Sequence, residues 1–126
     1  MSEKILHKEL SYKIYGHCFK AHNELGPFRS ERSYGDYLEN LFRLDNLDFK
    51  REHPLPPSFK GERLGRNRPD FIIGDKVILD LKTKRIVEKD DYHQMKRYLA
   101  ASKLDLGLIV NFRQKYLAPK RVLGGN

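Results

Sequence analysis

The chain contains one cysteine, Cys18, and no long apolar run. A single cysteine excludes an internal disulfide. No apolar stretch comes near the roughly 18 residues of a membrane-spanning helix, and the N-terminal residues do not show a secretory signal pattern. These absences predict a soluble, cytoplasmic protein with no membrane partner.

Internal repeats, low-complexity tracts and linkers are also missing from the sequence. Leu64-Gly65 lacks the spacing and the Lys-Ser/Thr ending of a Gly-rich phosphate loop. The chain has 126 residues, of which 39% are hydrophobic, and this is enough to fill one core. We therefore expect a single domain over residues 1–126.

Positive charge is the strongest feature of the composition. The formal net charge is +8 and the isoelectric point is about 9.6, so the field of the protein would attract polyanions. An ordinary basic protein would share this composition, so charge alone does not identify a nucleic-acid partner. The cations are dispersed, with local concentrations at Lys60, Arg63, Arg66 and Arg68 and at Lys115, Lys120 and Arg121.

An amphipathic helix is predicted over residues 6–25, because apolar side chains recur there every three or four positions. Gly26-Pro27 would end this helix. Cys18 lies on the apolar stripe, with His17 beside it and His22 one turn further on. Two ligands one turn apart without a second pair are a weak zinc signal, so we favour a buried thiol and partly exposed histidines.

A second helix is predicted over residues 31–46, with Ser30 as its N-cap. Tyr34 lies on its inward face, and Glu31 shares that face. Glu31 has two interpretations. It can be a first-turn acid favoured by the helix dipole, or a carboxylate that leans over a neighbouring hairpin as a metal ligand.

The C-terminal half contains a third predicted helix and further strands. Asp90 and Asp91 would begin the helix, which places Gln94 and Tyr98 one turn apart on one face. Residues 104–112 are an apolar run typical of a buried strand, and residues 116–123 would add an edge strand.

A short edge hairpin is expected over residues 58–64, with its turn at Lys60-Gly61. Together these elements predict an α/β fold, in which a mixed central β-sheet is flanked by helices on both faces.

The most informative stretch is a hairpin made of two apolar runs, residues 71–73 and 77–81. Each run has a carboxylate at the end far from the turn. With a three-residue loop, Asp70 stands opposite Asp80, with Cβ atoms roughly 4.5–5.5 Å apart, and Lys82 projects from the same side. A two-residue loop would put the carboxylates on opposite faces.

This carboxylate pair requires a cation, because two carboxylates on an apolar hairpin repel each other and are costly to desolvate. Lys82 supplies part of the charge, and a divalent metal would supply more. Hard oxygen ligands suit Mg²⁺ or Mn²⁺, which bind through carboxylates, water and phosphate oxygens. The pattern therefore indicates cleavage of a phosphodiester.

Arg66 and Arg68 lead directly into Asp70. A solvated loop would have the same composition, but cations beside a carboxylate pair would also hold a phosphate backbone. Both interpretations stay open.

Pro69-Asp70, nine intervening residues and then Asp80-Leu81-Lys82 resemble the signature of the PD-(D/E)XK nuclease superfamily. More narrowly, the chain resembles the small GxxExxY proteins from about residue 10 to residue 122. The resemblance implies a restriction-endonuclease-like core. It also implies that Mg²⁺ or Mn²⁺ is held by Asp70, Asp80, Glu31 and the backbone carbonyl of Leu81, and that Lys82 acts on the attacking water or the phosphate.

The resemblance extends to two further motifs. Glu31 and Tyr34 match the GxxExxY pattern, although Phe28 stands where its glycine would be. Gln94 and Tyr98 are similar to the QxxxY motif of RecB-like exonucleases, which lies beside the active site. The expected substrate-binding residues are therefore Gln94, Tyr98, Arg68, Arg66 and Tyr34. The single cysteine excludes the four-cysteine iron–sulfur cluster of some members.

These observations predict a metal-dependent nuclease that acts on nucleic acid, with DNA favoured over RNA. The alternative is a catalytically weak or inactive module on the same fold that binds nucleic acid or a protein partner. A structural oligomer would show neither metal binding nor salt-sensitive affinity for nucleic acid. Strand type and cleavage mode stay open, and a homodimer would suit cleavage of both strands of a duplex.

Overall fold

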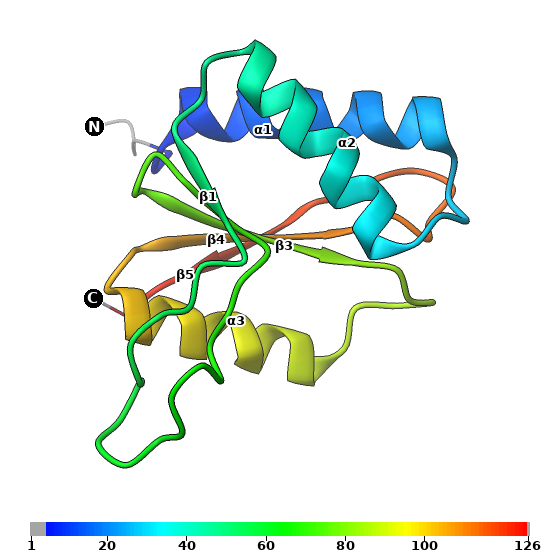
Figure 1. The fold of residues 1–126 in the computed structure, drawn as a ribbon. Coiled ribbons are helices and arrows are strands. Elements are labelled where there is room, and N and C mark those ends of the chain that lie inside the picture. The colour runs from blue at the N-terminus through cyan, green and yellow to red at the C-terminus, as the bar shows by residue number, and fades with distance from the viewer. Residues whose placement is uncertain (1–4, 126) are drawn as a thin grey trace.

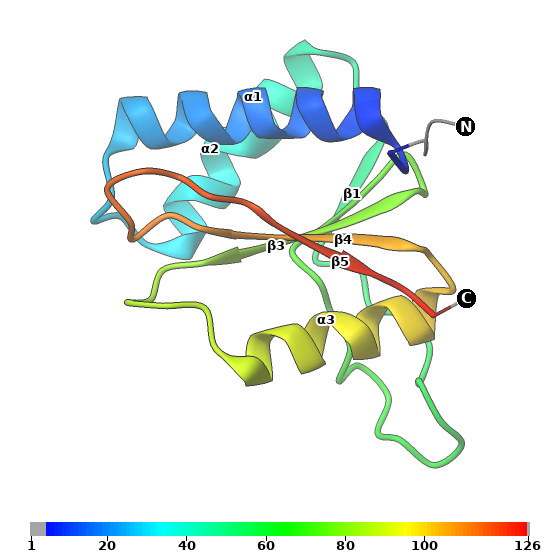
Figure 2. The same cartoon turned by 180° about the vertical axis from the view of Figure 1, so that it is seen from behind.

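The structure is a computed structural model that describes residues 5–125. The described helices are α1 (Lys8–Leu25), α2 (Glu31–Leu44) and α3 (Lys89–Ser102), and the described strands are β1 (Phe49–Arg51), β2 (Phe71–Ile73), β3 (Val77–Lys82), β4 (Leu106–Asn111) and β5 (Lys120–Leu123). The strands form one sheet in the order β1-β2-β3-β4-β5. Helices α1 and α2 cover one face and α3 covers the other (Figures 1 and 2). The predicted α/β architecture is confirmed.

Local signals set the ends of the helices. Helix α1 is followed by Gly26, whose φ of 75° lies in the left-handed region that favours glycine. Ser30 caps α2 as predicted, because its hydroxyl accepts a hydrogen bond from the Ser33 N–H at 3.1 Å. Helix α2 ends at Leu44, two residues earlier than expected, since Asn46 adopts a positive φ of 54°.

Strands β2 and β3 form the predicted hairpin with the three-residue loop. Ile73 pairs with Val77, and Phe71 pairs with Leu79. This register excludes the two-residue loop, so Asp70 and Asp80 meet at the same end of the hairpin. Strand β3 then pairs in parallel with β4, and α3 forms the crossover between them.

The edge of the sheet differs from the prediction. Residues 58–64 form no strand, so the expected hairpin at Lys60-Gly61 is wrong. The edge strand is β1, which pairs antiparallel with β2. Residues 58–64 are instead held by hydrogen bonds to the Glu62 side chain, which replace a strand ladder.

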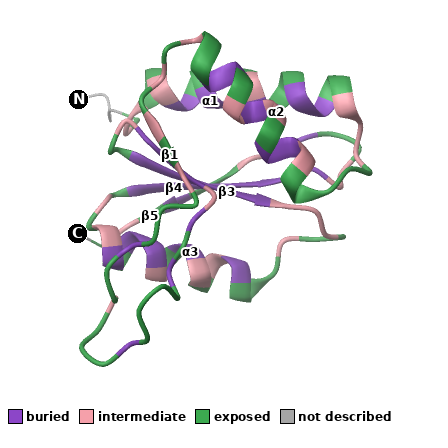
Figure 3. Cartoon of the chain, viewed as in Figure 1, coloured by how far each residue is buried: buried purple, intermediate pink, exposed green. Residues whose placement is uncertain are grey.

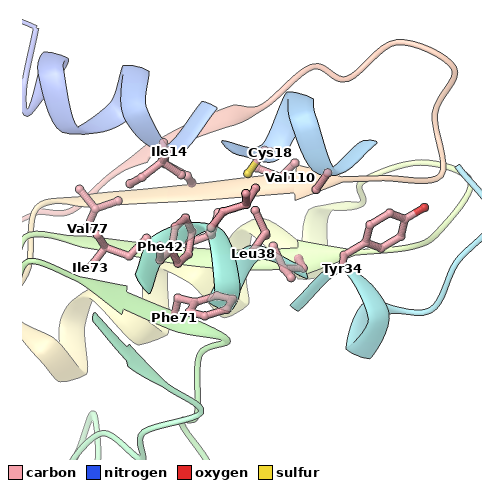
Figure 4. Packing of buried hydrophobic residues seen from close by; sticks show 14 of the residues in the cluster. Ile14, Cys18, Tyr34, Leu38, Phe42, Phe71, Ile73, Val77 and Val110 are labelled. Carbon is pink, nitrogen blue, oxygen red and sulfur yellow. The ribbon is translucent and has the colours of Figure 1, made fainter. Parts of the chain in front are cut away.

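The sheet separates two apolar cores. Strand β4 is buried along its whole length and β3 along nearly all of it (Figure 3). The core beneath α1 and α2 contains several aromatic rings, among them Phe42 and Phe71 (Figure 4). Tyr34 stacks on Phe112 with ring centroids 4.1 Å apart. The core on the other side packs α3 against the sheet through Met95 and Leu99.

The three residues of helix α1 that were considered as zinc ligands, Cys18, His17 and His22, are instead buried or hydrogen-bonded within the protein. Cys18 is fully buried as predicted, and burial raises the pKa of its thiol. His22 is buried rather than partly exposed, because its ring nitrogen donates to the Gln114 carbonyl at 2.7 Å. His17 is half-buried beside Asp45. Within residues 5–125, no helix has the length and apolar content needed to cross a membrane.

Candidate active site

The predicted site residues converge where the sheet meets the first turns of two helices. Asp70 directly precedes β2, and Asp80 and Lys82 lie at the C-terminal end of β3. Glu31 begins α2, and Gln94 lies in the first half of α3. Because the hairpin is antiparallel, the start of β2 and the end of β3 share one end of the sheet.

Asp70 and Asp80 form a close carboxyl pair. Asp80 is only 5% exposed, and one oxygen of Asp70 accepts a hydrogen bond from the Leu81 N–H at 2.7 Å. Burial, the charge of Asp80 and a hydrogen bond between the two side chains together raise the pKa of Asp70 to about 8. Asp70 therefore retains a proton near neutral pH when no cation is bound beside it.

Glu31 faces the same charges. Its carboxylate lies 3.5 Å from the Thr83 hydroxyl, which donates to it. Burial raises the pKa of Glu31, and Lys82 partly offsets that effect. The structure thus places Glu31 within electrostatic reach of Lys82 and Asp80, as the metal-ligand interpretation requires.

Lys82 is the cation at the centre of this group. Its ammonium lies 2.8 Å from an oxygen of Asp80 and donates to the side-chain carbonyl of Gln94, also at 2.8 Å. Burial alone would lower the pKa of Lys82, but the charge and hydrogen bond of Asp80, together with the charges of Asp91 and Glu31, outweigh burial, and the net pKa is raised. Lys82 is therefore protonated across the physiological range.

Asp91 and Lys84 extend the group, and the sequence did not single them out for the site. The Asp91 carboxylate accepts from the Lys84 ammonium at 2.9 Å and lies 3.9 Å from the Lys82 ammonium. It also accepts from the Glu88 N–H at 2.8 Å, which caps α3. The only available signal was the acid at the start of a predicted helix, which is common without function.

A small recess opens beside the carboxyl pair, with a volume of about 130 Å³. Glu31, Asp70 and Leu81 line it, together with two arginines that the sequence did not indicate, Arg32 and Arg51. Arg51 comes from β1, the strand that was not predicted. Its guanidinium pairs with Asp36 at 2.7 Å.

The expected substrate-binding residues differ in their burial and in their distance from the carboxyl pair. Gln94 is half-buried and holds Lys82, as described above. Tyr98 is buried, and burial followed by the charges of Asp80 and Asp70 raises its pKa. Tyr34 is fully buried, and its hydroxyl donates to the Gly26 carbonyl. Tyr34 therefore belongs to the core, and its expected contact with substrate is withdrawn.

Arg66 and Arg68 are exposed on the segment that enters Asp70. Arg66 lies 3.7 Å from Glu62, and Arg68 directly precedes Pro69-Asp70. Exposure fits both a solvated loop and a role in holding phosphate, so that role stays a prediction.

The donor set fits a divalent ion held mainly by two carboxylates. Within residues 5–125, no three His, Cys, Asp or Glu side chains are gathered tightly enough to form a ready-made cage. Mg²⁺ does not require such a cage, because it is commonly bound through one or two carboxylates, with water and phosphate oxygens completing the shell. The Asp70–Asp80 pair, in which Asp80 is buried and Asp70 half-buried, has the hard oxygens that such an ion would bind.

Comparison with known proteins agrees with this geometry. A family model described as the PD-(D/E)XK nuclease superfamily matches residues 8–122. Neither the curated proteins nor the solved structures gave a match. The match does not test the narrower likeness to GxxExxY proteins, which stays a prediction. The mixed sheet, the helices on both faces and the family match together confirm the restriction-endonuclease-like core. The chain therefore belongs to the PD-(D/E)XK nuclease superfamily.

Proposed function

We propose that this protein is a metal-dependent nuclease that hydrolyses phosphodiester bonds of nucleic acid, with DNA as the first substrate to test. The observation that carries the proposal is the close pair of half-buried Asp70 and buried Asp80, with the Lys82 ammonium 2.8 Å from Asp80. A purely structural hairpin would gain nothing from two facing carboxyls, because burial and the charge of Asp80 raise the pKa of Asp70 and the pair is costly to bury.

Asp70 and Asp80 are the residues that would hold Mg²⁺ or Mn²⁺, with Glu31 and the Leu81 carbonyl as further ligands. When bound, the metal would lower the pKa of a coordinated water and neutralise charge on the leaving oxygen. Occupation of the site would also ionise Asp70, since a nearby cation favours the charged carboxylate.

Lys82 contributes positive charge rather than a base. Its raised pKa keeps it protonated, so it can stabilise negative charge that develops on the phosphate. Gln94 accepts one of its hydrogens and Asp80 lies beside the same ammonium, and these contacts fix the ammonium in the site. Lys84 and Asp91 form the next ion pair outward and support this arrangement.

The test combines metal binding with cleavage. Calorimetric titration of Mg²⁺ and Mn²⁺ into the wild type and into Asp80→Asn would be followed by incubation with labelled DNA and RNA, each single- and double-stranded. Loss of binding and of cleavage in Asp80→Asn alone is the expected result. Asp75→Asn is the matched control, because Asp75 is an exposed aspartate at the opposite end of the same hairpin.

Lys82→Ala separates chemistry from metal binding. It should abolish cleavage while metal binding persists, because Lys82 is not proposed as a ligand. A folded wild type that binds no metal would reject the nuclease proposal and favour the binding module. Cleavage that survives in Lys82→Ala would reject the role of that residue.

A further inference from the structure

The segment between β1 and β2, residues 53–69, projects from the sheet on the side of α3 (Figures 1 and 2). We call it the basic arm. Its two ends are joined at the neck, where the Glu52 N–H donates to the Asp70 carbonyl at 3.0 Å and the Leu55 N–H donates to the Asn67 carbonyl at 2.7 Å. The arm therefore begins and ends beside the carboxyl pair.

The interior of the arm is braced by a buried carboxylate. One oxygen of Glu62 accepts from the Ser58 N–H at 2.7 Å, from the Ser58 hydroxyl at 2.9 Å and from the Asn67 amide at 2.6 Å. Its other oxygen has no hydrogen-bond partner within residues 5–125, and Arg66 lies 3.7 Å away. Burial of a carboxylate is costly unless it is satisfied, so this network fixes one shape for the arm.

The brace continues into the body of the protein and toward the site. The Asn67 side-chain oxygen accepts from Arg97 of α3 at 2.9 Å. The Arg97 guanidinium lies over the ring of Tyr98, 5.9 Å from its centre. The charges of Asp80 and Asp70 help to raise the pKa of Tyr98, so Tyr98 lies near the carboxyl pair. The hydrogen bond between Asn67 and Arg97 thus links the arm to α3, the helix that also supplies Gln94.

The outer surface of the arm combines cations with exposed apolar side chains. Its cations are Lys60, Arg63, Arg66 and Arg68, and all four are exposed. The only acid of the arm, Glu62, is buried, so the surface that it presents is positive. Phe59 is 58% exposed and Leu64 is 80% exposed beside these cations. Cations that contact the phosphates of a nucleic-acid strand, together with an exposed aromatic ring on which a base can stack, are the features that bind unpaired strands.

We propose that the basic arm binds single-stranded nucleic acid, with Phe59 stacking on a base and Lys60 and Arg63 contacting phosphates, and leads the strand past Arg68 to the Asp70–Asp80 pair. This inference rests on the proposed function, because the bound strand is taken to be the substrate. It specifies the substrate class as unpaired strands, since a duplex has no free base face for Phe59.

The test measures binding without cleavage. Full-length Asp80→Asn protein in EDTA would be titrated into a labelled single strand and into the blunt duplex of the same sequence, with affinity followed by fluorescence anisotropy. In this background Phe59→Ala should weaken single-strand binding roughly 5- to 100-fold. Duplex binding should change little. Phe59→Leu should behave like Phe59→Ala, because leucine keeps the apolar volume but has no ring face.

The loop between β4 and β5 offers matched controls. Lys115 and Tyr116 also place a cation beside an exposed aromatic ring, but this loop contacts the end of α1, on the other face of the sheet. Tyr116→Ala and Lys115→Ala should leave single-strand affinity unchanged. Lys60→Ala should weaken it and reduce its salt dependence, by about 0.7 in slope for one lost phosphate contact.

Strand length gives a second readout. Across oligonucleotides of about 4 to 16 nucleotides, the range of site sizes of single-strand-binding modules, Phe59→Ala should weaken binding of long strands more than of short ones. A short strand that fills only the carboxyl site does not reach the arm.

The outcomes separate this inference from the proposed function. Equal losses on single strand and duplex, or losses as large in the Tyr116 and Lys115 controls, would overturn the arm as a single-strand site. Unchanged affinity in folded Phe59→Ala and Lys60→Ala proteins would do the same, even if the wild type cleaves nucleic acid. If the wild type never cleaves but the arm variants lose single-strand affinity selectively, the arm stands and the nuclease proposal fails.

Discussion

Asp70 gives the molecule a specific dependence on pH. Burial, followed by the charge of Asp80, raises its pKa to about 8, whereas an aspartate in an unfolded chain titrates near about 3.9. Between these values the folded, metal-free protein holds a proton that the unfolded chain has released. Its stability should therefore fall as the pH rises from about 4 through about 8, by on the order of a few kcal/mol.

Thermal melts in EDTA at pH 5 and pH 9 would measure this effect. Wild type should lose more stability across the interval than Asp70→Asn, whose amide does not ionise. Added Mg²⁺ should raise the thermal stability of the wild type most at pH 9, because the ion would bind the ionised pair. Equal pH dependence in the two proteins would show that Asp70 has an ordinary pKa.

Gly35 allows Arg51 to lie across α2. A Cβ atom at Gly35 would stand 2.6 Å from a terminal nitrogen of Arg51, so Gly35→Ala should displace the guanidinium and break its pair with Asp36. Alanine in a helix interior is favoured over glycine by ~0.5–1 kcal/mol. We expect Gly35→Ala to be nearly neutral in the wild type but stabilising by about that amount in an Arg51→Ala background.

A double-mutant cycle by urea denaturation would measure this coupling between the two positions. Additive effects would mean that the Arg51 side chain moves aside freely. Arg51 lines the recess beside Asp70, so a real coupling would also link the helix surface to the site.

At the scale of elements, the contact between α3 and β4 depends on Gly107. A Cβ atom there would stand 2.5 Å from Cγ of Met95, which is almost fully buried. Gly107→Ala should therefore destabilise the protein by ~1–3 kcal/mol, through overpacking that displaces α3. Gly16→Ala is the control, because nothing lies within 4 Å of a Cβ atom at Gly16 in α1 and the change should be stabilising by ~0.5–1 kcal/mol.

Urea unfolding of both variants would give the two values. A neutral Gly107→Ala would show that Met95 repacks without moving the helix. Because α3 also holds Gln94 and Asp91, a displaced helix should reduce cleavage more than it reduces metal binding.

Elements with strong local signals were predictable. The β2–β3 hairpin combines apolar runs with a turn, and Ser30 and Gly26 mark helix ends, so the sequence was sufficient for these. Strand β1 was missed because it has three residues with no alternating pattern and gains its stability from pairing with β2.

The site residues divide in the same way into those with a local sequence signal and those without one. The positions of Asp70, Asp80 and Lys82 follow from the register of one hairpin. Tertiary packing brings Arg51 to the recess and places the Lys84–Asp91 pair beside Lys82. Tyr34 shows the converse error. Its motif suggested substrate, but its position on the inward face of α2 buried it in the core.

At the scale of the whole molecule, the net charge of +8 should make nucleic-acid binding depend strongly on salt. In the Asp80→Asn protein, the logarithm of single-strand affinity should fall linearly with the logarithm of salt concentration, with a slope of about −0.7 per phosphate contacted. A salt series of anisotropy titrations would measure it. An affinity insensitive to salt would show that charge is not the source of binding. The expected homodimer stays a prediction, which sedimentation of the protein alone and with duplex would test.

The crossover from β3 through α3 to β4 has a consequence for folding. The proposed catalytic residues Asp70, Asp80 and Lys82 precede β4 in the chain, but β3 is a central strand that needs β4 as its parallel partner. Parallel pairing closes a long loop and forms late relative to local contacts. During synthesis, the chain would therefore contain every proposed metal ligand before it has the framework that holds them together. The proposed nuclease activity would therefore be absent until residues 106–111 had emerged and paired, so a nascent chain would not cut the nucleic acids around the ribosome.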